Sequence, residues 1–149
     1  MAVFDDVAVA TTTITVLHPD IDLSFQSTAT NIQAGDIVTF TEQVTNTGEV
    51  PLVNIAISSD HGTPDDSTDD NLCLLAELDV GQSESCPLQI VAPTTTTTYR
   101  AEVTALTDAG LPLPDYELTS QAAITITVKP VDVPPDNNQS KLYLPVLVR

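Results

Sequence analysis

Hydrophobic and polar residues alternate along much of this chain with the two-residue period of a β-strand. The clearest run follows Gly35, and its two faces are made of alternate residues. One face holds Val38, Phe40, Glu42 and Val44, and the other holds Ile37, Thr39, Thr41, Gln43 and Thr45. This run therefore predicts a β-strand.

A turn follows this run at residues 46–49, Asn-Thr-Gly-Glu. Asn and Gly accept backbone angles that Val and Thr resist, so this sequence is typical of a turn. A second β-rich run, residues 52–58, comes directly after it. The two runs are predicted to form a hairpin.

Further runs with strand character are separated by polar segments that contain Pro or Gly. They cover residues 21–28, 72–78, 84–91, 97–106 and 118–129. The runs at 72–78 and 84–91 are expected to pair around a turn. With the central hairpin the count reaches seven strands. The predicted fold class is all-β: an Ig-like seven-stranded β-sandwich with extra N- and C-terminal β-strand extensions.

The domain boundaries follow from changes in composition along the chain. Residues 3–17 are rich in β-branched side chains, and a proline ends this run. Its last residues resemble the end of the 118–129 run, as if they closed a preceding module. Near the other end, a segment rich in Pro and Asn offers little to bury. We therefore predict an N-terminal β-strand extension at 1–18, an Ig-like β-sandwich at 19–129, a Pro-rich linker at 130–140 and a C-terminal hydrophobic strand at 141–149.

Composition narrows the classes of function. The 149 residues suffice for one sandwich core, which must be aliphatic because aromatic residues make up 4% of the chain and Trp is absent. The 21 acidic and 4 basic residues give a formal charge of −17. This charge repels phosphate and anionic lipid, so we expect no nucleic-acid partner and favour cations instead. No apolar run approaches the roughly 20 residues that span a bilayer, so membrane insertion is not expected.

The central residues also resemble a known repeat. The order G-D-x-V-T-F, V-T-N-T-G and N-I-x-I-x-x-D, followed by two cysteines around L-x-x-G-x-S, is similar to the DUF11-type Ig-like repeat of bacterial and archaeal surface proteins. The likeness covers roughly residues 19–129. It implies an extracellular, cell-surface β-sandwich in an adhesive or structural chain. The acidic loop after Asp60 is longer and more charged than is usual in that family.

Cys73 and Cys86 are the two cysteines of the chain. The resemblance implies a surface protein, and surface proteins lie in an oxidising compartment. There the two thiols are expected to form a disulfide. A bridge over a loop of this length would stabilise the fold by roughly 3 kcal/mol. The alternative is a pair of buried free thiols.

The loop at residues 59–71 is dense in carboxylates. They belong to Asp60, Asp65, Asp66, Asp69 and Asp70. Such hard oxygen ligands suit calcium, but the spacing lacks the Gly and the closing Glu of an EF-hand. We favour a solvated acidic loop, because blocks of like charge usually remain in water. A calcium site at these aspartates is the alternative, and no other cofactor is expected.

The sequence contains no recognisable set of catalytic residues, so we do not expect this protein to be an enzyme. Residues 81–85, Gly-Gln-Ser-Glu-Ser, miss the last Gly of a nucleophile elbow. His18 and His61 are the groups with an ordinary pKa near neutrality, and neither accompanies a nucleophile in a recognisable setting.

The C-terminal segment KLYLPVLVR is apolar on both faces of an extended strand and must therefore be covered. We predict that it docks on a sheet edge of an identical subunit. Its assembly residues are Leu142, Tyr143, Leu144, Val146, Leu147 and Val148. Lys141 and Arg149 flank this run and favour docking on an acidic body. The alternative is a trimmed sorting tail, which short Y-L-P endings of some exported bacterial proteins resemble.

Two functions are compatible with these features. The first is a non-catalytic structural subunit of an extracellular filament or surface stalk, whose Ig-like modules join by β-strand donation. The second is a calcium-dependent adhesive module of a larger cell-surface protein, which recognises a glycan or a host or neighbour-cell surface protein. The extra strands at both ends of the module favour the first.

Overall fold

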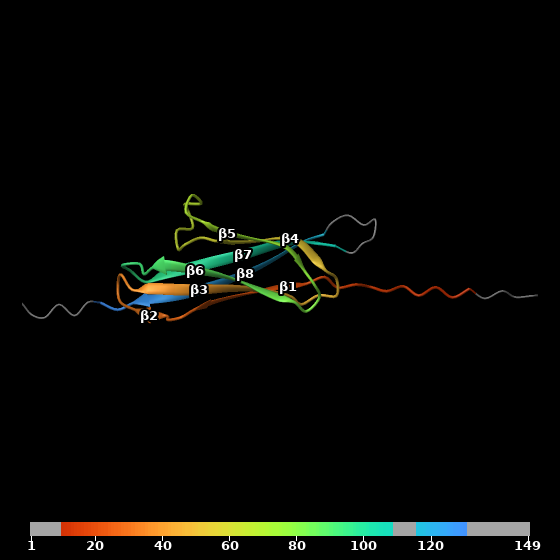
Figure 1. The fold of residues 1–149 in the computed structure, drawn as a ribbon, viewed down its shortest axis with the longest axis horizontal. Helices are drawn as coiled ribbons and strands as arrows, with labels where there is room; N and C mark the ends of the chain where they lie inside the picture. Colours follow the sequence, from red (N-terminus) through yellow and green to blue (C-terminus); the bar gives the residue numbers. More distant parts are fainter. Residues whose placement is uncertain (1–9, 109–115, 131–149) are drawn as a thin grey trace, which may run out of the picture.

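The computed structural model describes residues 10–108 and 116–130, which form two packed β-sheets (Figure 1). The strands are β1 (Ile21–Ser27), β2 (Asn31–Ile32), β3 (Ile37–Asn46), β4 (Leu52–Ser59), β5 (Asn71–Leu78), β6 (Ser83–Val91), β7 (Thr97–Thr107) and β8 (Glu117–Val128). Seven of these eight correspond to the predicted strands, and the short β2 is additional. No helix in these residues has the length and apolarity needed to cross a membrane.

One sheet has the strand order β1-β3-β6, and the other has the order β2-β8-β7-β4-β5. Neighbouring strands are antiparallel except for the parallel pair of β2 and β8. Because the alternate residues of each strand point to opposite faces, the inner faces of both sheets meet in one core. This arrangement confirms the predicted all-β, Ig-like sandwich.

Both predicted hairpins are wrong. β3 pairs with β1 and β6, whereas β4 pairs with β5 and β7, so the two central runs lie in different sheets. β5 and β6 likewise belong to different sheets. The physical reason is the same in each case: a crossing between sheets lets the apolar faces of consecutive strands cover each other, as a sandwich core requires.

Asn46 holds the crossing from β3 to β4. Its side chain is fully buried, and its Nδ2 donates to the carbonyl oxygens of Val50 (2.8 Å) and Leu78 (3.0 Å). Its Oδ1 accepts a hydrogen bond from the Gly48 N–H at 3.1 Å. The buried amide is therefore satisfied by backbone groups from two separate connections, which fixes the turn where the chain changes sheets.

The core is aliphatic around a short row of rings. The ring centroid of Phe40 lies 5.2 Å from that of Phe25 and 4.8 Å from that of Tyr99. The predicted alternation along β3 is confirmed, because Val38, Phe40, Glu42 and Val44 are all buried. One of these four, Glu42, is a carboxylic acid in an otherwise apolar row.

The predicted N-terminal strand is not formed over residues 10–17, its described part, which run as exposed chain away from the sandwich (Figure 1). The segment meets the module just before β1. There the N–H groups of Gly48 and Glu49 donate to the carbonyls of Asp20 (3.2 Å) and His18 (3.0 Å). Gly48 has no room for a side chain, because a Cβ would collide with this backbone.

The described chain leaves β8 at the opposite end of the sandwich from residues 10–20 (Figure 1). The predicted C-terminal strand at 141–149 and most of the linker lie outside the described residues. The proposed domain boundaries stay predictions.

Candidate functional site

The acidic loop lies between the end of β4 and the start of β5. Asp60, its first residue, forms hydrogen bonds that connect the start of the loop to β7. Asp60 Oδ1 accepts hydrogen bonds from the N–H groups of Gly62 and Arg100, both at 2.9 Å. The Asp60 N–H donates to the Arg100 carbonyl at 3.0 Å, and an Arg100 Nη lies 3.6 Å from Asp60 Oδ2. The carboxylate of Asp60 therefore faces β7 and anchors the loop.

Two further carboxylates of the loop are engaged locally. Asp66 Oδ1 accepts from the side chain and the N–H of Thr68, and these hydrogen bonds lower the pKa of Asp66 below its ordinary value. The Thr63 hydroxyl lies 2.9 and 3.0 Å from the two carboxylate oxygens of Asp69. These contacts are typical of polar turns, in which a side-chain oxygen caps nearby backbone or hydroxyl groups.

The five aspartates of the predicted calcium site are not brought together. Within the described part of the chain, no group of three or more His, Cys, Asp or Glu side chains is placed to hold a metal ion. Asp65 and Asp70 are exposed to solvent. Calcium binding at these aspartates therefore stays a prediction.

An open groove of about 530 Å³ lies on the outer face of the five-stranded sheet, next to this loop. Small side chains line much of it, and most of the remainder is polar or charged. The small residues include Ala56, Ser58, Thr104 and Ala123, and the charged ones include Asp70, Arg100 and Glu102. A shallow groove with mixed charges and a small-residue lining suits an extended or flat partner better than an enclosed small molecule.

β5 forms one edge of the five-stranded sheet, and its outer side chains are apolar. Leu72 and Leu74 are 60% and 69% exposed. They stand opposite Ser58 and Ala56 of β4, so they continue the outer face beyond the groove. We call Leu72, Leu74 and the backbone beside them, which pairs with no second strand in the part of the chain that the structure describes, the β5 edge.

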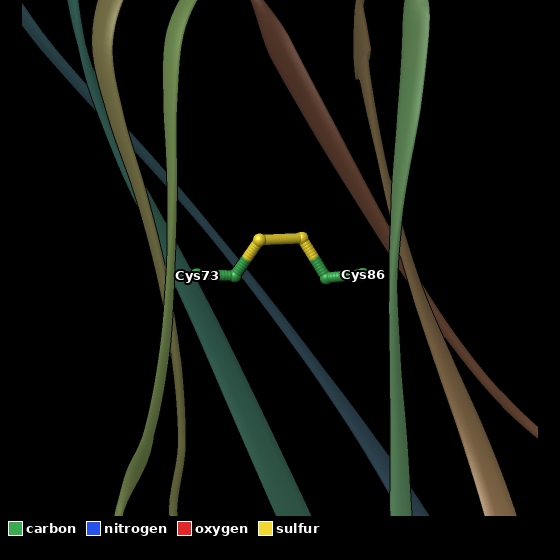
Figure 2. Close-up of a disulfide and its surroundings, with 2 residues drawn as sticks. All are labelled: Cys73 and Cys86. Carbon is green, nitrogen blue, oxygen red and sulfur yellow. A yellow bond between two sulfur atoms is a disulfide. The ribbon is translucent and has the colours of Figure 1, made fainter.

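A disulfide joins Cys73 to Cys86, as predicted, with the two Cα atoms 6.4 Å apart. Figure 2 shows the two side chains reaching toward each other from separate strands. Cys73 belongs to β5 and Cys86 to β6, so the bridge links the edge of one sheet to the edge of the other. It therefore closes this side of the sandwich and fixes the position of the β5 edge.

A buried polar cluster that the sequence pattern did not indicate lies beside this disulfide. Glu42 is fully buried, and its partners in the neighbouring strands are Cys86 and Phe25. Neither carboxylate oxygen has a hydrogen bond of good geometry within the described residues, and the same holds for the Ser59 hydroxyl and His61 Nε2. Burial raises the pKa of Glu42, although the nearby Ser59 hydroxyl and His61 ring act in the opposite direction.

The comparisons with known proteins support the fold. No protein-family model matches the chain, and no curated protein matches its sequence. The structure is similar to the CARDB domain of the PF1109 protein from Pyrococcus furiosus, which was solved in complex with di-metal ions. The TM-score is 0.52 and the identity 15%, and the match covers 79% of this chain and 95% of that one.

Two other solved structures match less well. They are a β-glucosidase from Erythrobacter marinus (TM-score 0.36, 11% identity, 72% of this chain and 15% of that chain) and the sporulation control protein Spo0M from Bacillus subtilis (TM-score 0.41, 10% identity, 74% and 50%). The resemblance to DUF11-type repeats is not matched by a family model. What the comparisons add is the architecture: this chain folds as an Ig-like β-sandwich similar to that of a CARDB domain.

Proposed function

We propose that this chain is a non-catalytic structural subunit of an extracellular filament or surface stalk, in which Ig-like modules join to identical copies by β-strand donation. The observation that carries the proposal is the β5 edge. Edge strands of soluble proteins usually carry charges, prolines or bulges that discourage pairing with another chain. β5 contains one charged residue, Glu77, and no proline, and two of its leucines are exposed.

The donor in this proposal is the segment at residues 141–149. An apolar strand with two apolar faces would aggregate if it stayed free, whereas docking on a sheet edge buries it. Burial of four aliphatic side chains at about 2 kcal/mol each would favour docking by several kcal/mol before the costs of ordering. A donor and an acceptor on one chain are what a homopolymer requires.

The path of the chain supports linear growth. Residues 10–20 and the chain after β8 leave the sandwich at opposite ends (Figure 1). A strand that leaves one copy and docks on the next makes a head-to-tail contact, and such contacts extend into filaments unless the rotation closes a ring.

An extracellular location is supported by the Cys73–Cys86 disulfide, since such bonds persist in oxidising compartments. The formal charge of −17 keeps separate filaments apart and disfavours nucleic acid and anionic lipid as partners.

The proposal is tested by electron microscopy in negative stain and by sedimentation of the full chain. We expect filaments or a ladder of oligomers, which Leu144→Asp combined with Val146→Asp should abolish. The conservative pair Leu144→Val and Val146→Ile is the matched control and should still assemble. A full chain that stays monomeric at high concentration, or an aspartate variant that still assembles, overturns the proposal.

A calcium-dependent adhesive module is the second candidate. The open groove beside the acidic loop favours it, and the similar CARDB domain was solved with di-metal ions. Its partner would be a glycan or a surface protein that meets the groove. Calcium would have to gather carboxylates that now lie apart, so its effect on the melting temperature discriminates between the two candidates.

A further inference from the structure

We infer that the β5 edge is the acceptor: residues 141–149 of a second copy add next to β5 and extend the five-stranded sheet by one strand. This inference rests on the proposed function, which takes the exposed β5 edge as its evidence. It adds which segment pairs at that edge and why the other edges suit that segment less.

The other described edges are less suited to an apolar strand. β6 has Pro87 in its interior, which cannot donate to a ladder. The exposed positions of β1 include Asp22 and Gln26. The outer face of β8 carries Thr119 and Thr125, and β8 already pairs with β2 at its end. Within the described residues, β5 is the edge with two exposed leucines on one face.

The two apolar faces of the donor match two apolar surfaces at β5. On the outer side, an added strand would lie against Leu72 and Leu74, which are largely exposed. On the inner side, Leu75 of β5 and Leu88 of β6 are half-buried at the open margin of the core. A donor with a polar face would leave one of these surfaces uncovered. The pattern of residues 141–149, apolar on both faces, covers both.

The charges at the ends of the two strands are complementary. Carboxylates bound the apolar part of β5, with Asp69 and Asp70 before it and Glu77 and Asp79 after it, and all four are exposed. Cations bound the donor, which begins with a lysine and ends with an arginine. At roughly 3.3 Å per residue the donor cations stand about 26 Å apart, close to the span of about 30 Å from Asp70 to Asp79. Both ends of the acceptor are acidic, so the match holds for a parallel or an antiparallel strand.

The linker can deliver the donor to a neighbour. β4 and β8 run in the same direction, since each is antiparallel to β7, so the chain leaves β8 at the end of the sandwich where the acidic loop lies (Figure 1). Residues 131–140 reach about 31 Å at roughly 3.1 Å per residue if they are extended. That reach exceeds the width of a sheet of this size, so the donor can begin on another copy.

The test uses full-length variants. Leu72→Lys with Leu74→Lys places two cations on the exposed acceptor face. We expect it to abolish assembly and to melt at the same temperature as the monomeric variant Leu144→Asp with Val146→Asp, because both then lack the stabilisation that assembly gives. Thr119→Lys with Thr125→Lys is the matched control, because it adds the same charge to the outer face of the same sheet; it should still assemble.

A complementation experiment tests directly whether the donor of one copy docks on the β5 edge of another. The lysine variant at β5 keeps an intact donor, and the variant Leu144→Asp with Val146→Asp keeps an intact acceptor. Each alone should be monomeric, and an equimolar mixture should form dimers that do not grow, as seen by sedimentation.

The set of outcomes distinguishes a failure of this inference alone from a failure of the proposed function. If the aspartate variant is monomeric while the β5 lysine variant still assembles, the acceptor lies elsewhere; this inference falls and strand donation stands. If the aspartate variant assembles, both fall. If the wild-type chain is monomeric and its β5 amides are protected from exchange only when residues 141–149 are intact, the tail covers its own module and both fall.

Discussion

Replacing Glu42 with Met should stabilise the fold at neutral pH. Glu42 is fully buried beside the disulfide, and among the described residues neither of its carboxylate oxygens has a hydrogen bond of good geometry. Met has a similar length and no branch, so it fills the same space without the polar atoms. Because a buried polar group without a partner costs about 1–3 kcal/mol, the substitution should raise the free energy of unfolding by about that amount.

The gain should depend on pH in a defined direction. The folded pKa of Glu42 is raised above its ordinary value of 4.5. Below pH 4.5 the carboxyl is protonated in both the folded and the unfolded chain. As the pH rises through the folded pKa, the wild type loses stability by as much as about 1.4 kcal/mol for each unit of the shift. The Met variant has no carboxyl at this position and does not lose stability in this way. The difference in free energy of unfolding between the Met variant and the wild type should therefore be small at pH 4 and larger at pH 8.

Thermal unfolding followed by circular dichroism measures this effect. For a domain of this size, about 4 °C in melting temperature corresponds to 1 kcal/mol, so we expect an advantage of about 4–12 °C at pH 8. Glu117→Met, which removes an exposed carboxylate, is the control and should show no such rise with pH. A Met variant less stable than the wild type at pH 8 would contradict the reasoning and would show that the buried carboxylate has a partner that stabilises its charge.

Three further measurements address the disulfide, the acidic loop and the N-terminal segment. Replacing both Cys73 and Cys86 with Ser should lower the free energy of unfolding by about 3 kcal/mol, and the native protein should gain two hydrogens in intact mass on reduction. Millimolar calcium should leave the melting temperature where sodium chloride of equal ionic strength leaves it; stabilisation near 2.7 kcal/mol, as for a site at a hundred times its Kd, would favour the adhesive module instead. Ile14→Asp with Val16→Asp should not affect assembly, and filaments lost in this variant would identify the N-terminal segment as the donor.

The positions of the strands could be predicted from the sequence because each strand of a sandwich buries one face. The predicted run at residues 97–106 agrees with β7 to within one residue, and the four residues that the alternation places on one face of β3, from Val38 to Val44, are all buried. The partners of those strands could not be predicted in the same way. A two-residue period tells which side chains share a face, and it carries no information on which strand lies alongside.

The turn between β3 and β4 illustrates this limit. Its Asn-x-Gly sequence is equally compatible with a hairpin and with a crossing between sheets. A tertiary contact decides between the two: the Asn46 side chain donates a hydrogen bond to the carbonyl of Leu78, at the end of β5. Similarly, the density of aspartates in the loop is visible in the sequence, whereas the directions of their oxygens depend on partners such as Arg100 and Thr63. The alternation places Glu42 on one face with Val38, Phe40 and Val44. That its carboxylate has no hydrogen bond of good geometry within the described residues depends on where Ser59 and His61 lie, which only the structure shows.

The two ends of the chain differ in how well they fit the β5 edge. Residues 10–17, ATTTITVL, carry alternate apolar side chains and no charge, and Ile14 is 83% exposed in the folded module. Such a segment could cover Leu72 and Leu74, but its threonine face would then meet the half-buried leucines on the inner side. It also offers no cation to the carboxylates at either end of β5.

The segment at 141–149 has the two features that residues 10–17 lack, an apolar second face and a cation at each end. It carries two of the four basic residues of an otherwise acidic chain. With the β5 edge as the proposed acceptor, pattern and charge together favour the C-terminal strand. We therefore expect the substitutions at Leu144 and Val146 to abolish assembly and those at Ile14 and Val16 to leave it unchanged.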